Sequence, residues 1–298
     1  MAPKNRFFNT ICSTCVTFLI FLASAPLITL AIPTTQLIPI PSTRSTSEPI
    51  VPAVYTETKA DKPVNISNTP EYDLFTYSER QERKLPTDLP ITEYFYGAKI
   101  IYLTFDDGPD QENTPIVLDI LKKNNIKATF FVLGTESEKY PNLLKRIYDE
   151  GHAIGNHSYN HIYRELYQST TTYLEQLHHT DEIIKSVLNV RPHISRAPGG
   201  SAGSFTKAYW PILKNQGYIE VGWNISSGDA SNAKENQILN NIIHQTESNK
   251  FLWSHAILLM HDGKGHTETA KALPHIIKFY KELGFEFHVI NSKTPPAW

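Results

Sequence analysis

The stretch Ile100-Ile101-Tyr102-Leu103-Thr104-Phe105-Asp106-Asp107-Gly108-Pro109 is an apolar run that ends in two carboxylates and a Gly-Pro turn. This pattern is typical of a buried strand that carries polar residues at its carboxyl end. Neighbouring strand residues normally point to opposite faces, but backbone that turns at the strand end can aim both aspartates into one cleft. The alternative for this stretch alone is an exposed Asp-Gly turn.

Short apolar runs alternate with helical periods from Ala98 to the end of the chain. We expect strands at residues 100–105, 128–133, 152–155, 194–196, 218–223, 256–260 and 285–290. Helices are expected between them, the first capped by Thr114 and opened by Pro115, the others at 138–150, 172–188, 205–217, 235–247 and 269–283. Seven such β/α units predict an α/β fold with a parallel sheet and outer helices, a distorted or incomplete (β/α) barrel rather than an open doubly wound sheet.

The N-terminal third of the chain has a different composition. Residues 1–32 combine Lys4 and Arg6 with a long apolar stretch, which predicts an export signal or a membrane anchor; cleavage and retention both remain open. Residues 33–97 are rich in Pro, Ser and Thr and predict a largely disordered linker. The alternative is a small β module, because residues 72–77 could form a short strand. The catalytic domain is expected to span residues 98–298, outside the cytoplasm, at the cell surface or secreted.

Charge and cysteine content exclude several classes of function. The formal charge of −2 across 298 residues argues against a nucleic-acid partner, which demands a basic surface. The two cysteines, Cys12 and Cys15, both lie in the apolar N-terminal segment, so the folded domain has no disulfide and no thiolate ligand.

Polar clusters follow five of the expected strands, at the end where barrel enzymes build their sites. These clusters contain Asp106 and Asp107, His157 and His161, Arg196 with Pro198-Gly199-Gly200, Asp229, and His261. The four-residue spacing of the two histidines suits one face of a helical turn and one shared metal ion. With Asp107 they make a His₂-Asp set with an open position, typical of catalytic zinc, although Co²⁺, Ni²⁺ or Mn²⁺ also suit such donors.

Hydrolysis with a metal-activated water needs a base for the water and an acid for the leaving group. Asp106 is the candidate base, and Arg196 can hold its carboxylate ionised and oriented. His261 is the candidate acid for an amine leaving group. The N–H group of Gly199 can donate to a developing oxyanion, because glycine lets the backbone approach the reacting group closely.

The chain resembles the polysaccharide deacetylases, the NodB-homology family of carbohydrate esterases (family 4), in the order and spacing of five motifs between residues 98 and 290. The motifs are Thr104-Phe105-Asp106-Asp107-Gly108-Pro109, His157-Ser158-Tyr159-Asn160-His161, Arg196-Ala197-Pro198-Gly199-Gly200, Trp223 with Asp229, and Leu259-Met260-His261. The resemblance implies a distorted (β/α)₇ barrel and metal-dependent removal of N-acetyl groups from amino sugars. It implies Asp106 as base, His261 as acid, and Asp107, His157 and His161 as metal ligands.

The fourth motif departs from the family pattern, because Ser226 stands where an acid is expected and Ala230 where a tryptophan is expected. Asp229 is then expected either to orient His261 or to brace Arg196. The sugar-binding side of the pocket is expected to depend on Trp223 and Leu259.

These features predict a monomeric, exported deacetylase that acts on N-acetylglucosamine in a cell-wall glycan, attached to the membrane if the N-terminal segment is retained. Peptidoglycan is favoured over chitin oligomers, because a long linker lets the domain reach polymer away from the bilayer. Two alternatives remain open, an O-acetyl esterase that uses the same site and a non-catalytic module that binds wall glycan.

Overall fold

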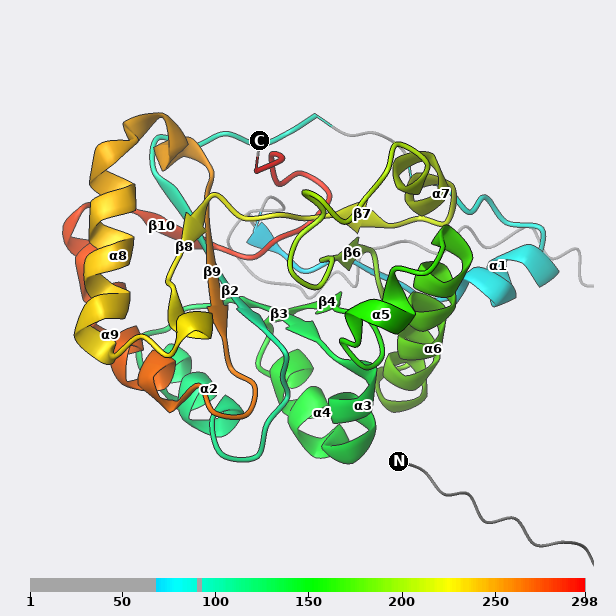
Figure 1. Ribbon diagram of the computed structural model, residues 1–298, viewed down its shortest axis with the longest axis horizontal. Helices are drawn as coiled ribbons and strands as arrows, with labels where there is room; N and C mark the ends of the chain where they lie inside the picture. The colour runs from blue at the N-terminus through cyan, green and yellow to red at the C-terminus, as the bar shows by residue number, and fades with distance from the viewer. Residues whose placement is uncertain (1–67, 90–92, 298) are drawn as a thin grey trace, which may run out of the picture. The chain divides into compact units, whose positions relative to one another are not determined.

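The computed structural model describes residues 68–89 and 93–297 of the chain (Figure 1). The predicted export segment and the linker as far as residue 67 lie outside the described residues. The strands are β1 Tyr72–Asp73, β2 Ile100–Asp106, β3 Thr129–Val132, β4 Ala153–Asn156, β5 Arg191–Pro192, β6 Ile194–Ser195, β7 Ile219–Glu220, β8 Ile225–Ser226, β9 Ala256–His261 and β10 Glu286–His288. The α-helices are α1 Tyr77–Glu82, α2 Thr114–Lys123, α3 Gly134–Lys139, α4 Pro141–Asp149, α5 Tyr163–Leu166, α6 Thr170–Leu188, α7 Tyr209–Asn215, α8 Glu235–Ser248 and α9 Thr267–Glu282, with 3₁₀ turns η2 at Asp229–Ser231 and η3 at Lys250–Ser254.

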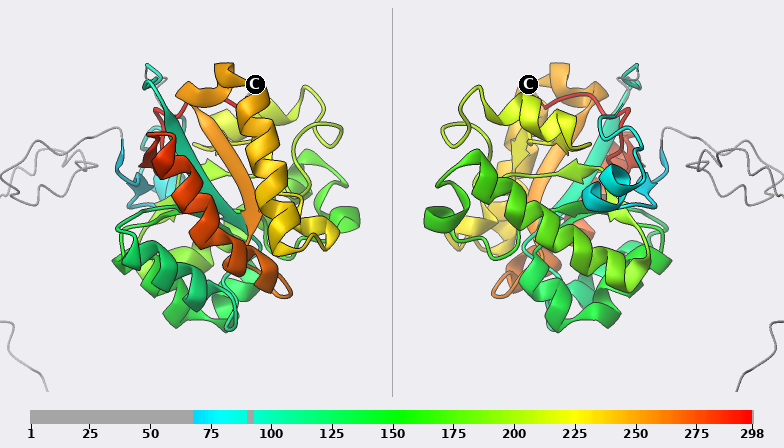
Figure 2. Two further views of the ribbon diagram at one scale, coloured as in Figure 1. Left: turned by 90° about the vertical axis from the view of Figure 1, so that its left-hand side faces the viewer. Right: turned by 90° about the vertical axis from the view of Figure 1, so that its right-hand side faces the viewer.

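Eight of the strands form one curled parallel sheet with the order β7-β6-β4-β3-β2-β9-β8, and β10 pairs with the first half of β2. Strands β7 and β8 stand at the two ends of this path, so the sheet is an incomplete barrel. The predicted α/β fold, a distorted barrel with outer helices, is therefore confirmed. The helices follow the strands and cover the outer side of the sheet, as α8 and α9 do beside β9 and β2 (Figure 2).

The two faces of β2 have different surroundings. Ile101, Leu103 and Phe105 pack in the main core under the outer helices. Ile100 and Tyr102 belong to a second cluster on the inner side of the curled sheet. Because strand residues alternate between faces, the final residue Asp106 belongs to the inner set. The same alternation along β9 places His261 on the inner side, where the site lies.

Some predicted boundaries differ from those in the structure. The single helix expected at 138–150 is two helices, α3 and α4, because the backbone of Tyr140 leaves the helical region and Pro141 starts a new helix. The strand expected at 218–223 is only Ile219–Glu220, and a further strand, Ile225–Ser226, follows it. Helix α2 is capped by Asn113, one residue earlier than predicted.

Residues 68–89 belong to the folded body, so the prediction of a linker up to residue 97 is wrong for this part of the chain. Strand β1 pairs antiparallel with β5, and the Tyr72 hydroxyl donates to the carbonyl of His152. Asp73 contacts the fully buried Arg191 with its Oδ2 3.4 Å from Nε. A two-residue strand and a buried ion pair leave no periodicity in the sequence, which explains the error. Within the described ranges, we find no helix whose length and apolar character would let it cross a bilayer.

Candidate active site

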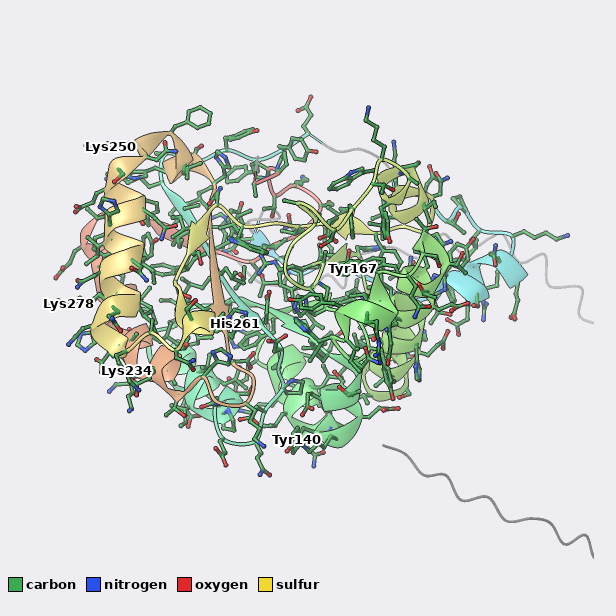
Figure 3. All side chains as sticks on the ribbon, viewed as in Figure 1. Tyr140, Tyr167, Lys234, Lys250, His261 and Lys278 are labelled. Carbon is green, nitrogen blue, oxygen red and sulfur yellow. The ribbon has the colours of Figure 1, made fainter. Side chains whose placement is uncertain are left out.

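The ladder between β2 and β9 positions the two proton-transfer candidates. The strands pair in parallel over six residues, and the last pair joins Asp106 to His261. Both residues end their strands and share the inner face, so they stand side by side at the carboxyl end of the sheet. Figure 3 labels His261 at the end of β9. This register brings together residues that are well over a hundred positions apart in the sequence.

Asp107 lies in a left-handed backbone conformation with φ of 73°, which reverses the usual alternation after Asp106. Its Oδ1 atom is 3.5 Å from Nε2 of His157 and 3.5 Å from Nε2 of His161. The other carboxylate, Asp106, has its Oδ2 3.7 Å from Nε2 of His157. Both carboxylates therefore converge on Nε2 of His157.

His157 and His161 are brought together by an irregular turn. The helical turn expected from their four-residue spacing is therefore wrong. Ser158 and His161 both have positive φ, at 78° and 59°. The side chain of Asn156 holds this turn, since its Oδ1 accepts from the N–H of Ser158 at 3.0 Å. The imidazole rings of His157 and His161 are 5.2 Å apart, and non-glycine residues in strained backbone often mark functional sites.

Asp107, His157 and His161 suit a metal ion. Oδ1 of Asp107 is buried and has no hydrogen-bond partner among the residues that the structure describes. Nδ1 of His157 donates to the Arg196 carbonyl at 2.8 Å, so its Nε2 carries the lone pair. Burial lowers the pKa of His157 despite the opposing charges of Asp106 and Asp107, so the ring is neutral near pH 7. Tetrahedral donors bonded at about 2.1 Å lie roughly 3.4 Å apart, close to the two 3.5 Å separations here.

Arg196 is fully buried and has a partner for each part of its guanidinium group. Nη1 donates to Oδ1 of Asp106 at 2.9 Å and to the Thr104 hydroxyl at 2.7 Å. Nε and Nη2 donate to the carbonyls of Val221 and Gly222, both at 3.0 Å. The predicted contact with Asp106 is confirmed, and these bonds fix the direction of its carboxylate.

Asp229 contacts His261 and has no contact with Arg196 among the described residues, which decides between the two expected arrangements. Its Oδ1 accepts from Nδ1 of His261 at 2.8 Å, and its Oδ2 accepts from the backbone N–H of His261 at 2.8 Å. Burial acts to lower the pKa of His261, but the hydrogen bond and charge of Asp229 outweigh burial and raise this pKa to about 9. His261 is therefore an imidazolium at neutral pH, the form that an acid requires.

Asp229, His261 and His266 form a second group of potential metal donors. Here the aspartate oxygens are already occupied, since Thr269 donates to Oδ2 at 2.8 Å and Ser227 donates to Oδ1 at 2.8 Å. A protonated His261 offers no lone pair to a cation. The group containing Asp107 is therefore the better metal site.

The predicted pocket residues lie around the loop that follows β6. Gly199 has φ of 71°, and its N–H finds no acceptor within the described part of the chain. The indole ring of Trp223 lies against Gly200, because a Cβ atom at Gly200 would come within 2.9 Å of this ring. Leu259 is almost fully buried in β9, two residues before His261.

No motif pointed to Glu220 in β7. One oxygen of its carboxylate accepts from the N–H of Ala197 at 2.6 Å, and the other accepts from the Ser195 hydroxyl at 2.9 Å. Burial raises the pKa of Glu220 to about 7. Because Ala197 lies between Arg196 and the glycines, Glu220 ties the loop to the sheet.

Asp262 follows His261 directly, but the sequence pattern assigned it no role. It is buried, and the Thr114 hydroxyl donates to its Oδ2 at 2.5 Å. A Cβ atom at Gly108 would meet the Asp262 carboxylate at 2.5 Å. Asp262 therefore packs directly on the turn after Asp107 and supports its shape.

Comparison with known proteins gives a consistent result. The family model for polysaccharide deacetylase matches residues 96–221. Two peptidoglycan-N-acetylglucosamine deacetylases of Bacillus cereus are 36% identical over 199 residues and 32% identical over 209 residues, covering 66% and 69% of this chain and 69% and 93% of the relatives. The crystal structure of the catalytic domain of peptidoglycan N-acetylglucosamine deacetylase from Eubacterium rectale is 31% identical with a TM-score of 0.61, covering 69% of this chain and 96% of that one.

Proposed function

The chain belongs to the polysaccharide deacetylase family, hydrolases of amide bonds, and on this premise we propose that it removes N-acetyl groups from N-acetylglucosamine in peptidoglycan. The observation that carries the proposal is the meeting of Asp106, Asp107, both histidines and His261 at one end of the sheet. Each reaction step then has a residue with suitable chemistry within reach.

Asp107, His157 and His161 would hold one divalent cation. Zinc fits their donor set best, and Co²⁺, Ni²⁺ or Mn²⁺ are the alternatives. The cation would supply Lewis acidity, which polarises the acetamido carbonyl and lowers the pKa of water. The unpaired Oδ1 atom of Asp107 supports this assignment, because a buried carboxylate oxygen without a partner is costly.

Asp106 takes the proton from the attacking water, and the hydrogen bond from Arg196 Nη1 to Asp106 Oδ1 orients the carboxylate for this transfer. Attack converts the planar amide carbon into a tetrahedral oxyanion, to which the N–H of Gly199 donates. His261 then protonates the amine as the C–N bond breaks, and acetate and a free amino sugar result. Asp229 orients the imidazole and keeps it charged before this transfer.

Trp223 and Leu259 would line the sugar-binding part of the site. Ser226 is tied to α8 through its backbone, because its N–H donates to Oε1 of Gln245 and its carbonyl accepts from Nε2 of the same side chain. Ala230 is exposed, so the wall that a tryptophan would form at this position is open.

A wall substrate agrees with the expected organisation of the chain. We propose that residues 1–32 direct export or anchor the chain in the membrane, that residues 33–67 form a linker, and that residues 68–298 form a monomeric catalytic unit. The enzyme would then act outside the cytoplasm. The folded unit includes residues 68–89, which precede the motifs, because β1 pairs with β5.

Mass spectrometry of muropeptides before and after incubation with the full chain tests the proposal. We expect each modified muropeptide to lose the mass of one acetyl group in exchange for hydrogen, and acetate to appear in equal amount. Chitin oligomers and O-acetylated glycan, assayed in parallel, test the two nearest alternatives. Glycan binding without acetate release from any of these substrates would favour a non-catalytic module and refute the proposal.

A further inference from the structure

Tyr163 lies beside the candidate active site but belongs to none of the five motifs. It begins α5, two residues after His161, and its ring centroid is 5.2 Å from the His161 ring. A Cβ atom at Gly199 would come within 2.8 Å of the Tyr163 hydroxyl, so the ring lies directly against the glycine loop. Even so, Tyr163 is 51% exposed. It therefore presents an aromatic surface between a candidate metal ligand and the candidate oxyanion donor.

The Tyr163 ring is held in place by a column of tyrosines. It stacks on Tyr167 at 6.0 Å with an interplanar angle of 15°, and Tyr167 stacks on the fully buried Tyr173 at 5.9 Å. The Tyr167 hydroxyl donates to the carbonyl of Pro198 at 2.6 Å, which ties the column to the glycine loop. Figure 3 labels Tyr167 just after α5. A ring supported in this way loses little conformational entropy when a ligand packs on it.

The chemistry of this surface suits a sugar ring. A pyranose presents C–H groups on one face, and these groups pack well on an aromatic ring. This packing requires no charged group on the protein. The Tyr163 hydroxyl makes no hydrogen bond within residues 68–89 and 93–297, so it can bond a sugar hydroxyl. Trp223 lies against Gly200, just as Tyr163 lies against Gly199. Each of these two adjacent glycines therefore contacts an aromatic ring.

We propose that Tyr163 is a specificity-determining residue that packs against the pyranose ring of the substrate while the acetamido group enters the site. The inference rests on the proposed function, since it takes an amino-sugar polymer as the substrate. Tyr163 contributes to binding of the sugar and takes no part in proton transfer.

Steady-state kinetics with N-acetylated chitotetraose test this role in Tyr163→Ala and Tyr163→Phe variants of the full chain. We expect Tyr163→Ala to raise KM about tenfold, roughly 1.4 kcal/mol, with kcat changed less than twofold. Tyr163→Phe keeps the ring and should restore KM to within about threefold of the wild-type value. Tyr96→Ala is the matched control, because Tyr96 is also exposed but precedes β2, at the opposite end of the sheet, and its KM should not change.

A wild-type KM in Tyr163→Ala would overturn the inference, and so would a loss confined to kcat. If the wild-type chain releases no acetate from chitotetraose, the inference is tested by calorimetric titration of chitotetraose into wild type and Tyr163→Ala; the proposed function itself fails only if muropeptides also yield no acetate. Tenfold weaker binding to the variant supports the role of Tyr163, and equal binding refutes it.

Discussion

Replacing Asp229 by asparagine should move the basic limb of the pH profile of kcat/KM to lower pH. His261 must be protonated to act as the acid, and its pKa is about 9 instead of the ordinary 6.5. The Asp229 carboxylate is the main cause that opposes burial, and the difference between these two pKa values corresponds to roughly 3 kcal/mol. In Asp229→Asn the charge is lost, so the pKa of His261 should return to about 6.5 or lower.

The size of the effect depends on pH. With a pKa of about 9, roughly nine tenths of His261 is protonated at pH 8; with a pKa of about 6.5, roughly 3% is protonated. Because less His261 is protonated, kcat/KM of the variant should fall about 30-fold at pH 8. At pH 6 most of His261 is protonated in both proteins, so this cause should change kcat/KM very little. Acetate release is measured from pH 5 to 10 at constant metal loading.

Thr269→Ala is the control for Asp229→Asn, because it removes one hydrogen bond to Asp229 and keeps the charge. Its basic limb should shift far less than that of Asp229→Asn. The basic limb of Asp229→Asn could instead stay at the wild-type pH, with activity reduced by the same factor at every pH. That result would refute the proposal that His261 is the acid and that Asp229 sets its pKa.

Three further predictions concern the candidate metal site, Arg196 and residues 68–97. Asp107→Ala or a chelator should reduce acetate release at least about a thousandfold, and activity that persists in metal-free protein would contradict the mechanism. Arg196→Met should destabilise the fold by about 3 to 5 kcal/mol in urea unfolding, because Asp106 is left buried without its partner; a change below about 1 kcal/mol would show that the pair is not needed. A chain that begins at residue 98 should be less stable than one that begins at residue 68 by on the order of 3 kcal/mol, because Arg191 loses a buried partner; equal stabilities would show that β1 contributes nothing.

The sequence predicted the parts of the fold that depend on local pattern. The strands β2 and β9 are long apolar runs, and burial on both faces is what a parallel sheet covered by helices requires. The polar residues after these strands could be expected to meet, because parallel strands end at the same edge of the sheet. This reasoning brought Asp106 and His261 together before their register was known.

Interactions between distant segments could not be predicted in this way. Glu220 looks like a solvated strand residue in the sequence, and only the position of Ala197 across the sheet makes it a partly buried acceptor. The contact between Asp73 and Arg191 likewise depends on two segments with no shared pattern. The turn from His157 to His161 was mistaken for helix because spacing alone does not report the positive φ angles that shape it.

The parallel ladder between β2 and β9 also joins two distant parts of the chain in one site. The three candidate metal ligands all lie between residues 107 and 161, whereas His261 joins its neighbour Asp106 only when β9 docks. Contacts of such long sequence separation raise the contact order of the domain. A chain cut after α7 carries every candidate ligand but lacks the candidate acid. The candidate metal ligands and the candidate acid are thus supplied by separate lengths of the chain.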